Sequence, residues 1–151
     1  MSAGHKTIEI QSARKAVEYL NDQIWHDSIL YEIVLVRSGS ADRVVLKLDL
    51  SLDWKDEIYV NVELAFNECR HVRTQMNWGV KCISEGEQIF GAESSEADAL
   101  IDEIRETWRK VGIQLDNLGV FRMELASTGS TIEIVFSGIT VKHLGEPREV
   151  T

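Results

Sequence analysis

Apolar and polar residues alternate in two consecutive stretches of the chain, at residues 43–52 and 58–67. A repeat of two residues is typical of a β-strand that buries one face. The apolar positions in these stretches are Val44, Leu46, Leu48, Leu50, Leu52, Ile58, Val60, Val62, Leu64 and Phe66. A short polar segment joins the two stretches, so we expect neighbouring antiparallel strands.

Three further stretches predict strands. Residues 29–36 are largely apolar at both odd and even positions, which favours a strand covered on both sides. The segment 38–42 after it has the composition of a hairpin loop. Residues 121–125 and 132–136 alternate again, and after Gly138 the apolar positions fall out of phase, which predicts a β-bulge at this glycine. Short strands are also expected at 80–83 and 88–90.

Two segments have the period of a helix. Ser12 is a suitable N-cap for a short helix that ends near Asn21, with an apolar stripe on one face. The second helix is predicted over Ser95–Val111, opened by Ser95 with Asp98 three residues later and ended by Gly112. Its stripe contains Ala97, Leu100, Ile101, Ile104, Trp108 and Val111. We expect this stripe to pack on the sheet and seal it.

The pattern as a whole predicts an α+β fold: a curved antiparallel sheet of about five to seven strands, one long amphipathic helix packed on it, and a short N-terminal helix. The chain has the length of one domain, and no segment has the composition of a linker, so residues 1–151 are predicted to form a single domain. The ends at 1–7 and 145–151 are expected to be frayed.

The charge of the chain bears on its partners. The net charge is −9, and the segment Glu85–Glu106 contains eight acidic residues against one basic residue. Such a surface repels phosphate groups and anionic lipids, so we expect neither nucleic acid nor a membrane as a partner. A basic protein would be attracted to it.

A cytoplasmic location is expected, because the N-terminus is polar and the longest apolar run is only Ile33–Val36. Cys69 and Cys82 are expected to be reduced thiols, and their spacing does not resemble that of a zinc site. We expect neither a metal nor a cofactor.

Two groups of residues are candidates for binding a partner. The acidic face of the second helix and the residues before it contribute four carboxylates, Glu96, Asp102, Glu103 and Glu106. Trp54 and Trp78 lie in polar or aperiodic segments, where exposed aromatic residues favour protein interfaces. A homodimer formed through Trp54 or through an edge strand is a further possibility for such a chain.

Trp25-His26-Asp27-Ser28 invites a catalytic interpretation, but adjacent residues of an extended chain point to opposite faces. The structural interpretation makes Trp25 a core residue and lets Asp27 or Ser28 bond to nearby backbone groups. Cys69 is a second candidate, because Arg70 and Arg73 beside it would favour a thiolate and His71 is two residues away. The alternative function is therefore a small enzyme or ligand-binding domain with a cleft that contains His26, Asp27, Cys69 and His71.

The opening Trp25-His26-Asp27-Ser28-Ile29-Leu30 and the closing hairpin at 132–141 resemble those of several small bacterial domains. Some of these domains are classed as immunity proteins of polymorphic toxin systems. The resemblance implies a β-rich scaffold with a binding role, and it carries over no catalytic residue. The sequence thus favours a non-enzymatic binding protein, an immunity-type inhibitor that engages a basic toxin or another basic protein through its acidic surface.

Overall fold

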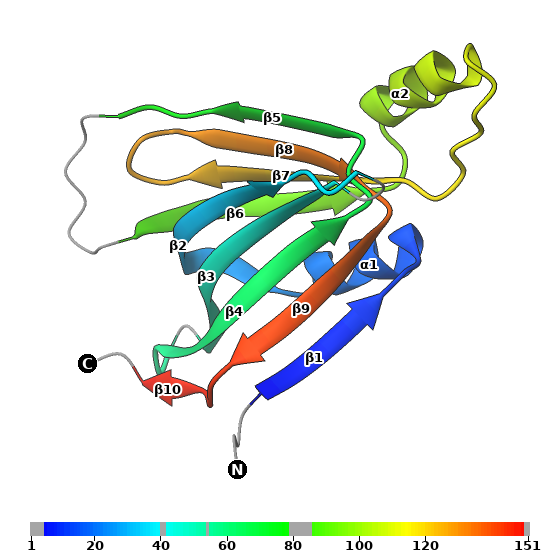
Figure 1. Cartoon of the computed structure of the whole chain (residues 1–151). Coiled ribbons are helices and arrows are strands. Elements are labelled where there is room, and N and C mark those ends of the chain that lie inside the picture. The colour runs from blue at the N-terminus through cyan, green and yellow to red at the C-terminus, as the bar shows by residue number, and fades with distance from the viewer. Residues whose placement is uncertain (1–4, 40–41, 54, 79–85, 150–151) are drawn as a thin grey trace.

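The computed structural model describes residues 5–39, 42–53, 55–78 and 86–149. Within these residues, ten strands form one open antiparallel sheet, and two helices accompany it (Figure 1). The strands are β1 His5–Ile10, β2 Ile24–Val36, β3 Arg43–Asp53, β4 Ile58–Asn67, β5 His71–Gln75, β6 Glu87–Ser95, β7 Gly119–Leu125, β8 Thr131–Phe136, β9 Gly138–Leu144 and β10 Arg148–Glu149, and the helices are α1 Ala13–Asn21 and α2 Ala99–Arg109. The predicted α+β fold with an antiparallel sheet is confirmed, but the predicted number of strands was too low.

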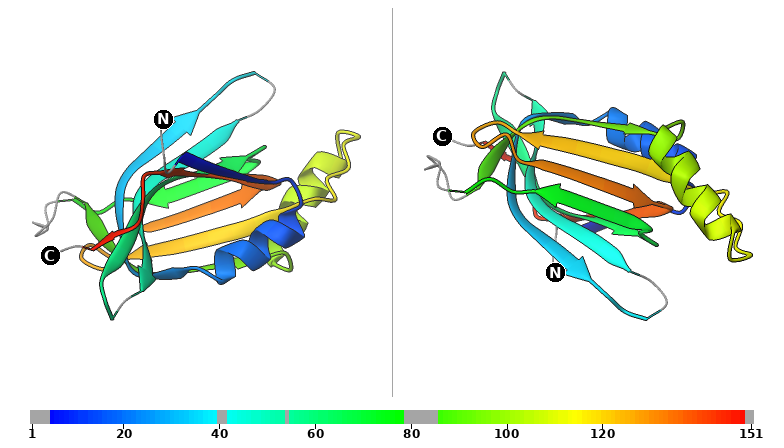
Figure 2. Two further views of the ribbon diagram at one scale, coloured as in Figure 1. Left: turned by 90° about the horizontal axis from the view of Figure 1, so that it is seen from below. Right: turned by 90° about the horizontal axis from the view of Figure 1, so that it is seen from above.

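The sheet curves so strongly that its two halves face each other across the core (Figures 1 and 2). Its strand order is β1-β9-β4-β3-β2-β6-β7-β8-β5, with β10 added to β4. Phe66 of β4 packs against Phe121 of β7 and Phe136 of β8, with ring centroids 4.9 and 5.1 Å apart. All three rings are fully buried, so one continuous core lies between the halves.

The short helix α1 forms as predicted. Ser12 is its N-cap, and the Ser12 Oγ accepts a hydrogen bond from the Lys15 backbone N–H. The predicted apolar stripe is buried, and it consists of Ala13, Ala16, Val17 and Leu20. The helix contacts β6, β7, β9 and β1, and its stripe contributes to the core between the two halves of the sheet.

The alternation in β3 and β4 is confirmed along most of both strands, whose apolar positions between 44 and 50 and between 60 and 66 are buried. Leu52 and Ile58 at the turn end are the exceptions: 42% of the Leu52 surface is exposed, and Ile58 is half-buried. The register of the two strands shifts between Ser51 and Asp53, so the alternation of faces breaks just before this end of the hairpin.

Two strands lie in segments that were expected to be frayed. Residues 5–7 belong to β1, which pairs with β9, and Arg148 and Glu149 form β10, which pairs with β4. The strand β5 lies in a stretch without a clear period and pairs with β8. The expected strand at 80–83 lies outside the described residues.

Gly138 does not form the predicted bulge within one strand. The chain leaves β8, which pairs with β7 and β5, and enters β9, which pairs with β4 and β1. Gly138 is therefore the point where the chain passes from one half of the sheet to the other. A Cβ atom here would lie 2.6 Å from the carbonyl oxygen of Ile10, so the crossing requires glycine.

The strand β2 is not covered on both sides. It pairs with β6 only at Ile29 and Leu30, and its later residues continue with β3 into a hairpin that projects from the body (Figure 2). Leu35 on this hairpin has 63% of its surface exposed. Some apolar residues of 29–36 therefore face solvent, and the prediction that both faces of this strand are covered is wrong.

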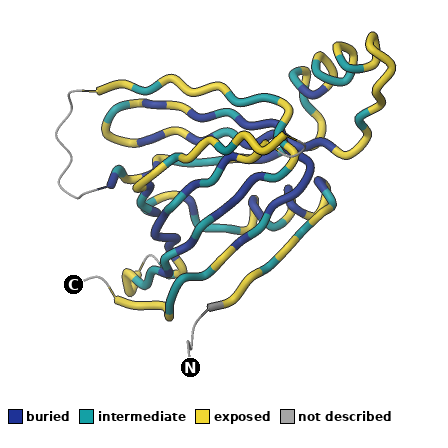
Figure 3. Tube along the Cα trace, viewed as in Figure 1, coloured by how far each residue is buried: buried dark blue, intermediate teal, exposed yellow. Residues whose placement is uncertain are grey.

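The second helix does not seal the sheet. It begins after Asp98, whose side chain accepts a hydrogen bond from the Leu100 N–H, and Ser95 belongs to β6 instead. The helix extends beyond the end of the sheet, and Ile101 is its only buried residue (Figures 1 and 3). Ile101 packs in a small second cluster with Leu118, Val120 and Val135. Neither helix of the described residues is long and apolar enough to cross a membrane.

Candidate functional site

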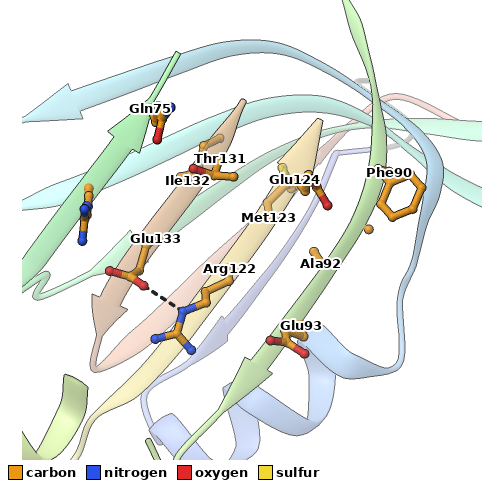
Figure 4. Close-up of a pocket in the computed structure, with 12 residues that line it drawn as sticks. Gln75, Phe90, Ala92, Glu93, Arg122, Met123, Glu124, Thr131, Ile132 and Glu133 are labelled. Carbon is orange, nitrogen blue, oxygen red and sulfur yellow. Dashed lines mark hydrogen bonds and ion pairs between the residues drawn. The ribbon is translucent and has the colours of Figure 1, made fainter. Parts of the chain in front are cut away.

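A groove of about 600 Å³ crosses the outer face of the half-sheet formed by β6, β7, β8 and β5 (Figure 4). We call it the outer groove. Five charged residues line the groove: Arg73, Glu93, Arg122, Glu124 and Glu133. The exposed aromatic side chain of Phe90 lies at its margin. None of the candidate residues predicted from the sequence lines this groove.

Charges of alternating sign cross the groove because of the strand register. Arg73 of β5 lies opposite Glu133 of β8, Glu133 lies opposite Arg122 of β7, and Arg122 lies opposite Glu93 of β6. Cross-strand neighbours of opposite charge stabilise a sheet by up to about 1 kcal/mol per pair. The row therefore supports the pairing of the β7–β8 hairpin with β6 on one side and with β5 on the other.

The centre of this row is neutralised by short ion pairs. The Arg122 Nε donates to Glu133 Oε2 at 2.8 Å. The other two guanidinium nitrogens of Arg122 donate to the carboxylate of Asp98 at 2.7 and 3.0 Å, which ties the first turn of α2 to β7. The His71 Nε2 lies 3.1 Å from Glu133 Oε1. Arg122 and Glu133 thus have partners already.

These contacts lower the pKa values of both carboxyls. The hydrogen bonds from Arg122, and next the backbone N–H of Leu100, lower the pKa of Asp98 to about 2. Burial raises the pKa of Glu133, but the hydrogen bonds from Arg122 and His71 outweigh it, so the pKa is lowered overall. A carboxyl whose pKa falls on folding stabilises the folded state only while it is ionised.

Acid is therefore expected to destabilise the attachment of α2. The stabilisation from Asp98 is fully present above its unfolded pKa, near 4, and is lost as the pH falls towards its folded pKa of about 2. Asp98→Asn removes the charge and weakens the cap, and we expect it to cost about 2 kcal/mol at pH 7. Urea unfolding at pH 7 and pH 3 measures this: the difference between wild type and variant should shrink at pH 3. An equal difference at both pH values would contradict the assignment.

The Trp25–Ser28 segment has a structural role in β2. Trp25 is buried, its Nε1 donates to the Leu20 carbonyl oxygen at 2.7 Å, and its ring packs edge-on against Phe121 with centroids 5.3 Å apart. The buried Ser28 Oγ donates to the Ile24 carbonyl oxygen and accepts from the Ser51 N–H. This pair of bonds spans a bulge, where the register jumps between Ile24 and Ile29.

His26 and Asp27 hold the neighbouring strand β6. The His26 Nδ1 lies 3.1 Å from the Phe90 carbonyl oxygen, and the two rings are perpendicular with centroids 6.4 Å apart. Asp27 has a positive φ of 75° and accepts a hydrogen bond from the Gln88 Nε2. These contacts flank a bulge at Ile89–Gly91, and Phe90 within it is 59% exposed. The contiguous His-Asp pair thus supports the edge of the outer groove.

The structure does not bring the four residues of the predicted cleft together. His26 and Asp27 lie at the start of β2, whereas Cys69 lies just before β5 and His71 begins it, and β6, β7 and β8 separate β2 from β5 in the sheet. Burial raises the pKa of the Cys69 thiol to about 12, and its Sγ donates to the Phe66 carbonyl oxygen. A protonated, hydrogen-bonded thiol is a poor nucleophile at neutral pH. Cys82 lies outside the described residues.

The predicted acidic residues remain on the surface. Glu96, Asp102 and Glu103 are exposed and make no ion pair in the described part of the chain. Glu106 is bound by Arg109 at 3.0 and 2.8 Å, so its charge is partly compensated. These residues lie on or beside α2, which extends beyond the end of the sheet (Figure 1).

The aromatic candidates differ in their environment. Trp78 has 83% of its surface exposed, and Trp54 lies outside the described residues. Trp108, predicted as a core residue, lies under the guanidinium of Arg70 with its ring centroid 4.9 Å away. Just beyond the helix, Val111 is 68% and Ile113 is 42% exposed. The projecting helix therefore combines acidic side chains with an apolar tip.

Sequence reasoning missed the outer groove because its residues come from four strands. The one available signal was the polar face of the β7–β8 hairpin, where Arg122, Glu124 and Glu133 occupy outward positions. The sequence gives no indication that these positions meet Glu93 and Arg73, since that depends on strand order.

Comparisons with models of protein families, with curated proteins and with solved structures give no match to this chain. Among the described residues, no group of three or more His, Cys, Asp or Glu side chains is arranged to hold a metal ion.

Proposed function

We propose that this chain is a binding protein that engages a basic protein through α2 and the adjoining outer face, as an immunity-type inhibitor of a basic toxin. The observation that carries the proposal is the placement of α2. Beyond its first turns the helix extends past the end of the sheet (Figure 1). Asp102 and Glu103 on the helix and Glu96 just before it have no ion-pair partner in the described residues, and the chain just after the helix exposes Val111 and Ile113.

The physical case rests on two different contributions. Exposed carboxylates raise the rate of encounter with a basic partner and disfavour acidic ones, while each rim charge adds little affinity. Affinity comes mainly from apolar groups that become fully buried at the centre of an interface. The projecting helix offers both, with Val111 and Ile113 at its tip and carboxylates along its length.

Two further observations support this function over a small enzyme. The Trp25–Leu30 opening resembles that of several small bacterial domains, some of which are classed as immunity proteins, and this resemblance implies a binding role. The four residues of the alternative cleft are divided between the start of β2 and the segment that leads into β5, and burial raises the pKa of the Cys69 thiol to about 12. Support for a nucleophilic mechanism through Cys69 is therefore weak.

The experiment is a calorimetric titration of this chain with the product of the adjacent open reading frame, since immunity genes lie beside toxin genes. We expect a basic protein that binds with one-to-one stoichiometry. Its affinity should fall at least about tenfold between about 50 and 300 mM salt, because salt screens exposed charges. Absence of binding, or an affinity that does not depend on salt, would contradict the proposal.

A further inference from the structure

We infer that the space above Gly91 in the outer groove is a seat for a lysine or arginine side chain of the partner. This inference rests on the proposed function, because it specifies how a basic protein would dock on the face beside α2. The seat is defined by Gly91, Phe90 and Glu93 of β6 and by Glu124 of β7 (Figure 4).

Gly91 leaves a vacant position on the outer face of the sheet. A Cβ atom added to it would have nothing within 4 Å, and its φ is not in the left-handed region. Neither backbone conformation nor crowding therefore requires glycine here. Because Gly91 has no side chain, the groove is open at this position, where any other strand residue would place a side chain.

The neighbours of this vacancy are carboxylates. Glu124 lies directly opposite Gly91 in the register of β6 and β7, which places their β-positions about 5 Å apart. Glu93 is two residues along the same strand and therefore points to the same face. Glu93 and Glu124 are both exposed, and neither makes an ion pair within the described residues.

The nearest arginine forms no ion pair with either of these carboxylates. Arg122 lies opposite Glu93, but all three of its guanidinium nitrogens already donate to Asp98 and Glu133. Arg73 lies at the other side of the groove, on β5. A cation above Gly91 would thus find two carboxylates without ion-pair partners, with no free guanidinium on β6 or β7 to repel it.

Phe90 adds an aromatic side chain to the seat. The bulge at Ile89–Gly91 places Phe90 on the outer side beside Gly91, and the ring is 59% exposed although it is large and apolar. A guanidinium or ammonium beside an aromatic face gains about 0.5–1 kcal/mol at an exposed site. His26, bonded to the Phe90 carbonyl oxygen, fixes this part of the strand. The His-Asp pair of the sequence therefore acts as a support for the seat.

A side chain of a protein fits this site better than a free ion. The groove has a volume of about 600 Å³ and continues from Gly91 across β7 and β8 to Arg73. A segment lying across these strands would place a basic residue over Gly91 and a neutral or acidic residue beside Arg73. The polarity of the groove thus specifies the orientation of the segment as well as its charge.

The test fills the vacancy without changing any charge. Gly91→Leu occupies the seat, and Gly145→Leu is the matched control, because a Cβ at Gly145 also has nothing within 4 Å and this residue lies between β9 and β10. The probe is a nine-residue peptide of alternating Lys and Ser, followed by NMR titration of labelled protein. We expect the largest shifts at Phe90, Gly91 and Glu124 in the wild type. Gly91→Leu should weaken binding at least about fivefold, and Gly145→Leu should leave it unchanged.

The same two variants are titrated with the basic partner, which separates failure of the seat from failure of the proposed function. If the wild type does not bind the partner, the proposed function fails. If the wild type binds and Gly91→Leu binds at least about tenfold more weakly than Gly145→Leu, the seat is supported. Equal affinities of the two variants for both the peptide and the partner would overturn the seat while leaving the proposed function in place.

Discussion

Replacing Trp25 with alanine is expected to lower the free energy of unfolding by about 4 kcal/mol, a large part of the stability of a domain of this size. Trp25 is 6% exposed, and its ring packs against Phe121 in the core. Its loss would leave a cavity between β2 and β7. It would also leave the Leu20 carbonyl oxygen without its indole donor at the end of α1.

Urea unfolding followed by circular dichroism measures this change. Trp78→Ala is the matched control, because Trp78 is 83% exposed and its removal should change the unfolding free energy by less than about 0.5 kcal/mol. Trp25→Phe should fall between the two, since it keeps an aromatic ring in the core and loses the hydrogen bond. Similar unfolding free energies for Trp25→Ala and Trp78→Ala would show that the core is not organised as described.

The local sequence pattern correctly predicted the elements whose capping residues and apolar positions lie within the element itself. The helix α1 has a suitable cap at Ser12 and a continuous apolar stripe, and both are present in the structure. The strands β3 and β4 alternate cleanly because one of their faces contacts the core along most of their length. In these segments local propensity and tertiary burial agree.

Other elements depend on contacts that no local pattern contains. The strand β5 has few apolar residues and forms because it pairs with β8, and β10 is only two residues long and pairs with β4. For α2, the amphipathic stripe predicted a helix correctly but did not specify the surface that it covers. The helix meets the sheet only through its first turns, where Ile101 enters a small cluster and Asp98 binds Arg122.

The candidate site shows the same division. The exposed acidic residues of α2 could be predicted, because a run of charges on an amphipathic helix remains in water. The outer groove could not, since Arg73, Glu93 and Arg122 come together only through strand order and register. The contiguous Trp25–Ser28 segment has the residue types of a catalytic motif, but its side chains contact different parts of the fold. Trp25 packs in the core, Ser28 bonds to β3 and His26 contacts β6.

The central claim is that the acidic face of α2 binds a basic protein, and reversing its charge is expected to weaken that binding about 100-fold. The triple variant Glu96→Lys, Asp102→Lys and Glu103→Lys changes three exposed residues that have no ion-pair partner in the described chain. Like charges facing each other across an interface are costly, and the steering of the encounter is lost as well. A 100-fold loss corresponds to about 2.7 kcal/mol of binding free energy.

A second triple variant provides the control. Asp56→Lys, Glu146→Lys and Glu149→Lys changes three exposed acids in the β3–β4 turn and near β10, away from α2 (Figure 1). Both variants raise the net charge from −9 by the same amount, so they differ only in the position of the change.

The most direct measurement is the ratio of the dissociation constants of these two triple variants for the basic partner, determined by calorimetry at about 150 mM salt. We predict that the α2 variant binds about 100-fold more weakly than wild type and that the control variant stays within about threefold of wild type. Equal losses in the two variants would mean that only the net charge of the chain matters, and would contradict a binding site on α2.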